Sequence, residues 1–275
     1  MQEERGRSGG ARAVTQKGGT IGQQGLAHGR KDRVTHPALQ MAVRLVYPPR
    51  CTLCGVPVAD EFGLCGPCWR DTPFVTGLVC DLCGTPLPGE SDGAVHCDAC
   101  LGIARPWARG RAALRYEANG RRLVLALKHG DRHDVARPAG KWLARAAAPL
   151  LQPGTLLAPV PLHWLRLLSR RFNQSALLAQ ALARETGLVV IPDLLIRSRH
   201  TRSLKGLDRA ARHATLDRAI RANPRHLAAL RGARLLLVDD VMTSGATLSA
   251  ATQAAQAAGA AEVCILALAR ADKDP

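Results

Sequence analysis

Two adjacent carboxylates and a short loop of small, hydroxylated residues stand together near the C-terminus of the chain. The acids are Asp239 and Asp240, and the loop runs from Thr243 to Thr247. Hydroxyls and backbone N–H groups at the start of a helix favour a bound anion. Two carboxylates cannot bind that same anion, but they suit vicinal hydroxyls or a hydrated magnesium ion. The combination predicts a sugar-phosphate site rather than a solvated acid pair beside an ordinary helix start.

Eight of the nine cysteines form a second group of residues that could do chemistry. They make four C-x-x-C pairs: Cys51 and Cys54, Cys65 and Cys68, Cys80 and Cys83, and Cys97 and Cys100. Each pair lets two thiolates meet one metal ion, and Gly55 and Gly84 allow a tight turn after two of the pairs. This regular pairing favours zinc over redox chemistry, and a reducing compartment disfavours disulfides. Because four thiolates leave no open position for water, we expect two structural zinc ions.

The assignment of these cysteines to two ions is open from their spacing alone. Sequential pairing, which we favour, places the first four cysteines on one ion and the last four on a second. An interleaved cross-brace is the alternative. His96 adjoins Cys97 and could replace a ligand, although a surface position is the more ordinary expectation. With either pairing, metal binding supplies folding free energy of order 10 kcal/mol per site.

The pattern of apolar residues indicates which elements position the acids and the loop. The run Leu235–Val238 predicts a strand that is buried on both faces and ends at the acid pair. A helix is expected from the loop to about Ala258, and the run Val263–Ala269 predicts the next strand of a βαβ unit. Further strands are expected at Leu156–Leu162 and Leu188–Ile191, with a helix between them over Ser175–Thr186.

The alternation of strands and helices from about residue 107 predicts an α/β fold with a doubly wound, mostly parallel sheet flanked by helices. Open sheets of this kind bind ligands beyond the carboxyl ends of their strands. The site is therefore expected where strands 156–162 and 234–239 end.

Charge and composition narrow the range of partners. The chain has 38 Lys and Arg residues against 22 Asp and Glu, a formal net charge of +16. This surplus favours anionic partners such as nucleotides, pyrophosphate or nucleic acid. Aromatic residues make up 3% of the chain and do not alternate with basic residues, so the sequence gives single-stranded DNA binding only weak support.

The N-terminal 40 residues are rich in Gly, Gln and Arg and show hardly any apolar periodicity, which predicts a disordered tail. An alternative is that translation begins at Met41, where a compact domain would open. No apolar run is long enough to span a bilayer, and the N-terminus lacks the apolar segment of a secretory signal. We therefore expect a soluble, cytoplasmic protein without membrane attachment.

The stretch Leu235–Thr247, with the sequence LLLVDDVMTSGAT, closely resembles the phosphoribosyl-pyrophosphate signature of type I phosphoribosyltransferases. In that family the acid pair holds the 2′- and 3′-hydroxyls of ribose, and the loop holds the 5′-phosphate. The resemblance assigns the first role, at the catalytic centre, to Asp239 and Asp240. It assigns the second role to Val241, Met242, Thr243, Ser244, Gly245, Ala246 and Thr247.

A zinc ribbon followed by a phosphoribosyltransferase domain is the architecture of the ComF family, which includes the GntX group. The segment that ends near Lys128 is similar to the family's YEG…LK segment, and the turn with Pro161 and Leu162 resembles its pyrophosphate loop. The sequence RRFNQ matches the family's RGFNQ motif except that Arg171 replaces glycine. The resemblance places these residues on the pyrophosphate side. The alternatives are that Lys128 is an ordinary basic residue at a helix end and that Arg171 points to solvent.

Residues 197–215 resemble the flexible lid of the family, in which Leu207 and Arg212 keep their places. Arg212 is the lid residue expected to contact phosphate during catalysis. Leu204 and Thr215 replace the usual Gln and Asn of the lid. Because a lid excludes water and completes the charge clamp, these replacements are expected to affect turnover more than binding.

These features imply a disordered tail over residues 1–40, a double zinc ribbon over residues 41–106 and a phosphoribosyltransferase-like domain over residues 107–275. The expected activity is magnesium-dependent binding of phosphoribosyl pyrophosphate and transfer of its phosphoribosyl group to a nitrogen nucleophile, in competence and DNA uptake or in nucleotide salvage. The alternative is a non-catalytic accessory protein of DNA uptake that senses nucleotides or binds single-stranded DNA. Proteins of the competence machinery and a second copy of the chain, in a homodimer, are left open as partners.

Overall fold

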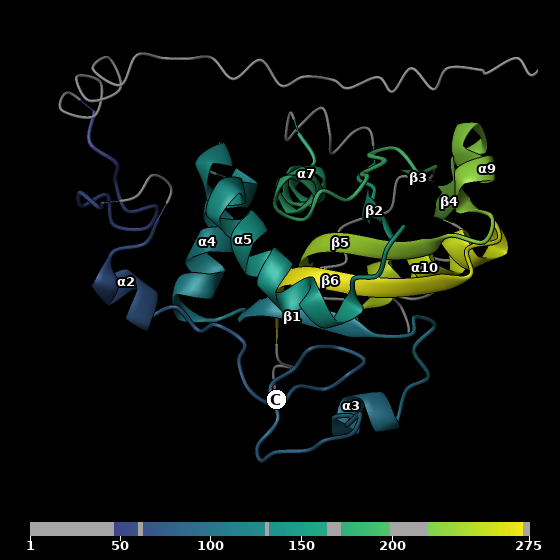
Figure 1. Cartoon of the computed structure of the whole chain (residues 1–275), viewed down its shortest axis with the longest axis horizontal. Coiled ribbons are helices and arrows are strands. Elements are labelled where there is room, and N and C mark those ends of the chain that lie inside the picture. The colour runs from purple at the N-terminus through teal and green to yellow at the C-terminus, as the bar shows by residue number, and fades with distance from the viewer. Residues whose placement is uncertain (1–46, 60–62, 130–131, 164–171, 199–218, 272–275) are drawn as a thin grey trace, which may run out of the picture. The chain divides into compact units, whose positions relative to one another are not determined.

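The computed structural model describes residues 47–59, 63–129, 132–163, 172–198 and 219–271 (Figure 1). Residues 44–275 form one compact unit, which contains every described helix and strand. The tail expected over residues 1–40 and the alternative start at Met41 lie outside the described residues. No helix within the described ranges is both long and apolar enough to cross a membrane.

A four-stranded parallel sheet forms the centre of this unit. Its strands are β1 (Gly110–Arg115), β2 (Leu156–Pro159), β5 (Arg234–Met242) and β6 (Glu262–Arg270), in the order β1-β6-β5-β2. β5 and β6 pair in parallel, with Leu237 opposite Ile265. Both strands are apolar along most of their length because both faces of the sheet are covered. The expected parallel α/β fold is confirmed.

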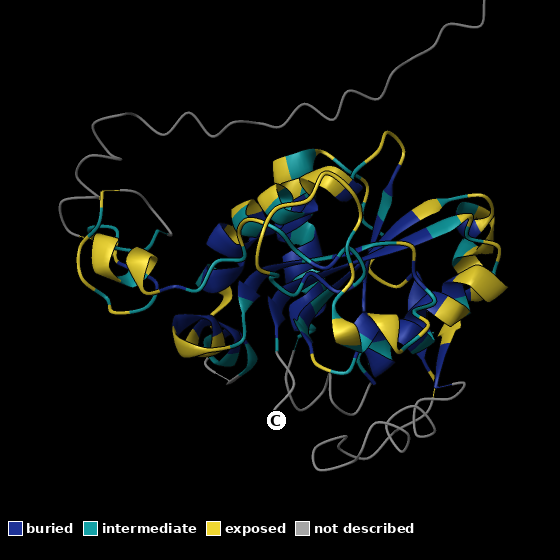
Figure 2. Ribbon diagram, turned by 90° about the horizontal axis from the view of Figure 1, so that it is seen from below, coloured by how far each residue is buried: buried dark blue, intermediate teal, exposed yellow. Residues whose placement is uncertain are grey.

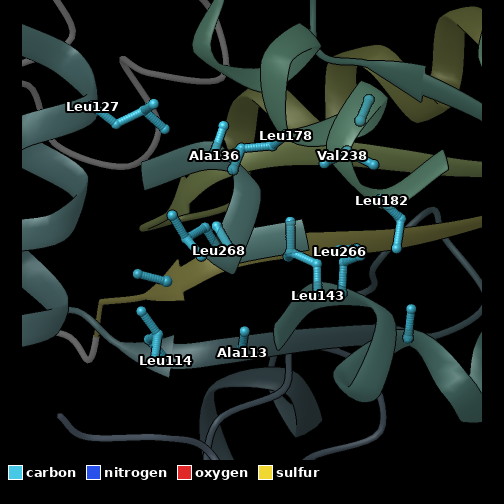
Figure 3. Close-up of a cluster of buried hydrophobic side chains, with 14 of the residues drawn as sticks. Ala113, Leu114, Leu127, Ala136, Leu143, Leu178, Leu182, Val238, Leu266 and Leu268 are labelled. Carbon is cyan, nitrogen blue, oxygen red and sulfur yellow. The ribbon is translucent and has the colours of Figure 1, made fainter. Parts of the chain in front are cut away.

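Helices cover the two faces of the sheet. On one face lie α4 (Ala118–His129), α5 (Ala136–Ala147) and α7 (Gln174–Thr186), and on the other lies α10 (Ala246–Ala257). Figure 3 shows the core on the first face, where Leu143 of α5 lies near Leu266 of β6 and Leu178 of α7 lies near Ala136. In Figure 2 the strands are largely buried, whereas yellow, exposed residues lie on the outer sides of the helices. The spacing of apolar residues on each helix therefore matches a single core-facing stripe.

The remaining elements are short. They are helices α2 (Gly66–Arg70), α3 (Asp98–Leu101) and α9 (Leu227–Leu230), 3-10 turns at His133–Val135, Ala148–Leu150 and Pro224–His226, and strands β3 (Leu195–Arg197) and β4 (Ile220–Ala222). β3 and β4 pair antiparallel on either side of the expected lid. Arg197, which the sequence places in that lid, is instead the buried last residue of β3, so the expectation of a mobile polar residue is wrong there. Residues 199–218 lie outside the described ranges.

Irregular segments cover both edges of the sheet. At the β1 edge, Phe74 forms an antiparallel bridge with Leu114, and the Val75 amide donates to Ala113 O at 2.9 Å. At the β2 edge, the strand expected at Leu188–Ile191 is reduced to one parallel bridge between Val190 and Leu157. The backbone groups of both outer strands are therefore partly satisfied by loops rather than by further strands.

The ends of α7 follow from single residues. Asn173 caps its N-terminus, because its Oδ1 accepts from the Ser175 amide at 3.0 Å. The Nδ2 of Asn173 donates to Val160 O at 3.1 Å, which ties the helix start to the turn after β2. Gly187, with φ of +71°, ends the helix directly after Thr186, which is where the sequence predicts the helix to end.

We expect Gly140→Ala to destabilise the fold. An added Cβ at this position of α5 would lie 2.9 Å from the backbone carbonyl of Ala181 on α7, so the two helices would have to move apart. Alanine otherwise stabilises a helix by about 1 kcal/mol relative to glycine, but overpacking should lower the free energy of unfolding by about 1–3 kcal/mol in urea denaturation. Gly93→Ala is the control, because its Cβ would meet nothing within 4 Å. Unchanged or increased stability of Gly140→Ala would contradict this close helix contact.

Candidate functional site

Asp239 and Asp240 lie inside β5, near its carboxyl end. The sequence predicts a strand that ends at the acid pair, whereas pairing with β6 continues to Met242. The Oδ1 atom of Asp239 accepts hydrogen bonds of 2.9 Å from the Ser175 hydroxyl and from the Asp240 amide. Asp240 forms an ion pair with Lys128, whose Nζ lies 3.2 Å from its Oδ2. The two acids therefore have different partners, one from α7 and one from α4.

The environment of Asp239 favours its protonated form. Burial of the carboxyl group raises its pKa to about 7, and the negative charge of Asp240 adds to this effect. The hydrogen bonds from Ser175 and from the Asp240 amide lower the pKa, as does the charge of Lys128, but they do not cancel the rise. Near neutral pH Asp239 is thus poised to lose a proton when a ligand brings donors or positive charge.

Lys128 is the penultimate residue of α4. The sequence leaves two roles for it, a pyrophosphate contact and a basic helix end. The ion pair with Asp240 is a further interaction that neither interpretation predicts, and the Lys128 side chain is only 21% exposed. Its ammonium group therefore offsets part of the repulsion between the two adjacent acids.

The loop after β5 turns carbonyl oxygens toward the protein and amides away from it. Arg270, the last residue of β6, donates through Nη1 to the carbonyl oxygens of Met242 and Thr243, at 3.1 and 2.9 Å. In a trans peptide the C=O and the next N–H point in opposite directions. The amides of Thr243 and Ser244 therefore point away from Arg270. Gly245, with φ of +80°, is the N-cap of α10, so the first helical amides need another acceptor.

The side chains of the predicted loop differ in exposure. Val241 is half-buried and Met242 is buried in the core, as is Ala246, so these residues offer the loop mainly their backbone. Thr243 is exposed, and Ser244 and Thr247 are half-buried. The Ser244 hydroxyl lies 3.4 Å from the Ala246 amide. The hydroxyl-bearing residues therefore lie on the accessible side of the loop.

The structure describes only part of the expected pyrophosphate side. Pro161 is buried and Leu162 half-buried in the turn after β2, where the Val160 amide donates to Val238 O at 2.9 Å. Arg171 and Arg212 lie outside the described residues, and their roles stay predictions.

Two residues at the site were not identified from the sequence. Ser175 contacts Asp239 across 64 positions of the chain, and no local pattern marks it. Arg270 lies under the loop, and its Nη1 also donates to Ala271 O. The available signal for Arg270 was a lone cation at the end of an otherwise apolar strand that neighbours the acid-bearing strand.

The eight paired cysteines gather in two groups of four. Each group holds its sulfur atoms within 4.8 Å of one another, with Cys51, Cys54, Cys65 and Cys68 in the first and Cys80, Cys83, Cys97 and Cys100 in the second. This is the sequential grouping that the spacing favours, not the interleaved one. Gly55 and Gly84 have φ of +77° and +70°, as expected for the turns behind the first pair of each group.

Neighbouring thiols within each group shift one another's pKa, which lowers the pKa of one cysteine and raises that of others such as Cys68 and Cys80. Burial raises the pKa of Cys51, but hydrogen bonds from the backbone of Cys54, Cys65 and Leu53 outweigh it and bring the pKa to about 6. In the second group, a hydrogen bond from Cys80 lowers the pKa of Cys83 to about 3 against the effect of burial. Four sulfur ligands, amide hydrogen bonds and no carboxylate in either group are the chemistry of structural zinc.

The chain matches two domain families in its N- and C-terminal parts. Residues 42–101 match the double zinc ribbon domain, and residues 173–275 match the phosphoribosyl transferase domain. Together with the parallel sheet and the two cysteine groups, these matches define a phosphoribosyltransferase-like fold joined to a double zinc ribbon.

Relatives of known name share this combination over most of their length. The DNA utilization protein YhgH of Salmonella typhimurium is 31% identical over 233 residues, which cover 82% of this chain and 99% of the relative. Competence protein F of Haemophilus influenzae is 28% identical over 219 residues, which cover 76% of this chain and 91% of the relative. A solved structure of glutamine phosphoribosylpyrophosphate amidotransferase from B. subtilis matches 50% of this chain and 26% of its own, with 21% identity and a TM-score of 0.35. The chain belongs to the ComF family.

The raised pKa of Asp239 predicts how stability depends on pH. Because the folded protein holds this proton up to about pH 7 and the unfolded chain releases it near pH 4, stability should fall as pH rises between these values. Asp239→Asn removes the ionisable group, so at pH 8 it should be more stable than the wild type, by up to about 4 kcal/mol for a pKa raised from about 4 to about 7. At pH 4 the two proteins should have similar stability in thermal denaturation.

Asp134→Asn is the control for this experiment, because the Arg132 guanidinium lowers the pKa of that carboxyl. It should have the opposite effect and lose stability near neutral pH. If Asp239→Asn is no more stable than the wild type at pH 8, the raised pKa is wrong.

Proposed function

We propose that the chain binds phosphoribosyl pyrophosphate and transfers its phosphoribosyl group to a nitrogen nucleophile, with release of pyrophosphate. The observation that carries this proposal is the arrangement at the end of β5. Two carboxylates with separate partners precede a turn whose amides face away from Arg270, at the N-terminus of α10. Vicinal hydroxyls suit the carboxylates, and a phosphate suits the amides, so a phosphorylated pentose satisfies both.

Each group at the site has a role in this proposal. Asp239 and Asp240 hold the ribose hydroxyls, and the loop Val241–Thr247 holds the 5′-phosphate. Lys128 leaves its ion pair with Asp240 and forms one with the negatively charged pyrophosphate. The backbone around Pro161 and Leu162 orients that leaving group. Arg171 and Arg212 would add positive charge there, as the family resemblance predicts.

The reaction breaks the bond between ribose C1′ and the pyrophosphate oxygen, and the electron pair leaves with pyrophosphate. A bond from C1′ to the nitrogen forms, and the nitrogen loses a proton to the leaving group or to water. An oxocarbenium-like transition state is expected, and positioning and charge neutralisation supply the catalysis. Magnesium would neutralise pyrophosphate, and the acid pair could hold its water ligands.

The names of the relatives suggest where such an activity is used. A DNA utilization protein and a competence protein share the architecture of this chain over most of their length. We therefore infer a role in competence or in the use of nucleotides from incoming DNA, carried out in the cytoplasm, where thiols stay reduced for metal binding. The replaced lid residues Leu204 and Thr215 should lower turnover more than binding.

Isothermal titration with phosphoribosyl pyrophosphate and magnesium tests the binding step. The double variant Asp239→Asn, Asp240→Asn should lose at least about a hundredfold in affinity, because two charge-assisted contacts to ribose are weakened. A matched control, Glu90→Gln with Asp92→Asn, removes the same charge at two exposed positions and should bind normally. Equal affinity of the acid-pair variant and the wild type would overturn this site.

Turnover needs a separate measurement. Pyrophosphate release across a panel of nucleobases and simple amines should identify the nucleophile, and release should disappear in the acid-pair variant. Tight binding without release from any acceptor would instead favour the alternative function, a non-catalytic nucleotide sensor.

A second candidate function, binding of single-stranded DNA, is favoured by an aromatic pocket distant in sequence from the acid pair. A cavity of about 460 Å³ is lined by Trp69, Phe74 and Trp142 together with Arg111 and Arg145. The ring centroids of Trp69 and Phe74 are 4.5 Å apart, and those of Phe74 and Trp142 are 5.4 Å apart. Trp69 is 48% exposed. The sequence gives base stacking only weak support because it has no run of aromatic residues. The fold, however, brings these rings together from separate segments.

Fluorescence anisotropy with a labelled oligothymidine tests this second function. Trp69→Ala should weaken binding about tenfold, because stacking on one base contributes about 1–3 kcal/mol. Tyr47→Ala is the control, since Tyr47 is 77% exposed and lies outside the pocket. The same affinity for Trp69→Ala and the wild type would exclude the pocket as a stacking platform.

A further inference from the structure

One short segment, Arg105–Trp107, contacts both the second cysteine group and the loop Val241–Thr247, which we call the phosphate loop. The segment follows the ligand pair that ends at Cys100 and leads into β1. Its central carbonyl, Pro106 O, accepts a hydrogen bond of 2.7 Å from Gln256 Nε2 of α10. Both flanking side chains approach the turn that begins this same helix.

Trp107 fills the space between the cysteine turn and Gly245. Its side chain is buried, and its Nε1 donates at 2.6 Å to the carbonyl of Leu82, which lies between Cys80 and Cys83. On the opposite side, the ring atom Cη2 lies 3.0 Å from the position that a Cβ on Gly245 would take. The position of the loop therefore depends on where the cysteine turn holds this ring.

Arg105 contacts the same loop and the Trp107 ring. Its Nη1 donates to the Ser244 carbonyl at 2.8 Å, and its guanidinium lies 5.2 Å from the centre of the Trp107 ring. The guanidinium thus lies between the loop and the indole that the cysteine turn holds, and its Nε is buried without a hydrogen-bond partner in the described part of the chain.

The contact with Ser244 completes the orientation of the loop. Arg270 holds the carbonyls of Met242 and Thr243, and Arg105 holds the next one, that of Ser244. Since each peptide is trans, the amide of Gly245 must then point to the side opposite Arg105. Each of the three amides therefore points away from the arginine that holds the preceding carbonyl, and three such amides in a row could form an anion-binding nest.

The first cysteine group has different contacts. The Cys68 carbonyl accepts from Asn119 Nδ2 at 3.2 Å, and the Thr52 carbonyl accepts from Arg132 Nη2 at 3.0 Å. These contacts reach α4 and the segment after it rather than the loop at the start of α10. The two cysteine groups therefore support different parts of the site.

We propose that the second zinc site supports the phosphate loop. Arg105 is the positioning residue through which the zinc site fixes the orientation of the loop. Zinc on Cys80, Cys83, Cys97 and Cys100 fixes the turn that carries Leu82 and the place of Cys100. Trp107 and Arg105 then hold Gly245 and Ser244 so that the loop amides face the ligand. The effect on sugar-phosphate affinity rests on the proposed function, whereas the effect on loop order does not.

Hydrogen–deuterium exchange on the full zinc-loaded chain, without ligand, tests loop order directly. Arg105→Ala should speed exchange of the amides in residues 243–248 about tenfold, because one charge-assisted hydrogen bond is lost. Arg105→Lys keeps a donor for Ser244 O and should restore part of the protection. Trp107→Phe keeps an aromatic ring but loses the indole hydrogen bond to Leu82, so it should also speed exchange. It replaces Arg105→Ala as the test variant if Arg105→Ala folds poorly.

Arg109→Ala is the matched control. It removes an arginine that docks the same cysteine turn, with an ion pair of 3.0 Å to Asp81, but Asp81 keeps a second pair of 2.6 Å to Arg111. Loop exchange should be unchanged in this variant. If Arg109→Ala speeds loop exchange as much as Arg105→Ala, or if Arg105→Ala leaves it unchanged, Arg105 has no specific role in positioning the loop.

The role of the metal is tested by removing one ion at a time. Cys97→Ser with Cys100→Ser and Cys65→Ser with Cys68→Ser each change the second C-x-x-C pair of one group, and metal analysis should show one zinc lost from each. Only the first of these variants should speed loop exchange and weaken binding of phosphoribosyl pyrophosphate, by about tenfold. Equal loop exchange in both variants would overturn the proposal. If the wild type does not bind this ligand, the proposed function fails, and loop exchange still decides the inference.

Discussion

The orientation of three consecutive peptide groups after β5 is the constraint on which the candidate site depends. Arg270 and Arg105 hold the carbonyls of Met242, Thr243 and Ser244 on the protein side. Because a peptide group is planar and trans, fixing each carbonyl also fixes the direction of the next amide. Because the loop is already ordered, it loses little conformational entropy when an anion binds, and this raises the affinity.

The parallel pairing of β5 with β6 brings the other parts of the site to the same place. The register sets Met242 opposite Arg270, so that the arginine reaches the carbonyls that follow the acid pair. From one face of the sheet, α4 supplies Lys128 and α7 supplies Ser175. Each acid is thereby held by a residue from a different helix, and the half-buried Asp239 is left with a pKa of about 7.

Sequence analysis succeeded where the chemistry is local and failed where it depends on distant contacts. The C-x-x-C spacing predicted both cysteine groups, and one continuous stretch predicted the strand, the acid pair and the glycine turn. The extension of β5 through the acids could not be predicted, because pairing with β6 overrides the local preference of two aspartates. Contacts such as Ser175 with Asp239 and Arg105 with Ser244 join residues 64 and 139 positions apart. No periodicity or short motif encodes such pairs.

The bridge between Phe74 and Leu114 has a consequence for solubility. Strand β1 would otherwise present its outer row of amides and carbonyls to water, and such a row can pair with the same strand of another molecule. The covering segment lies between the two cysteine groups, so its course depends on both metal sites. We therefore expect zinc depletion to expose the unpaired edge of β1 and to promote self-association. The supply of zinc would then limit the concentration at which a cell can hold this protein in solution.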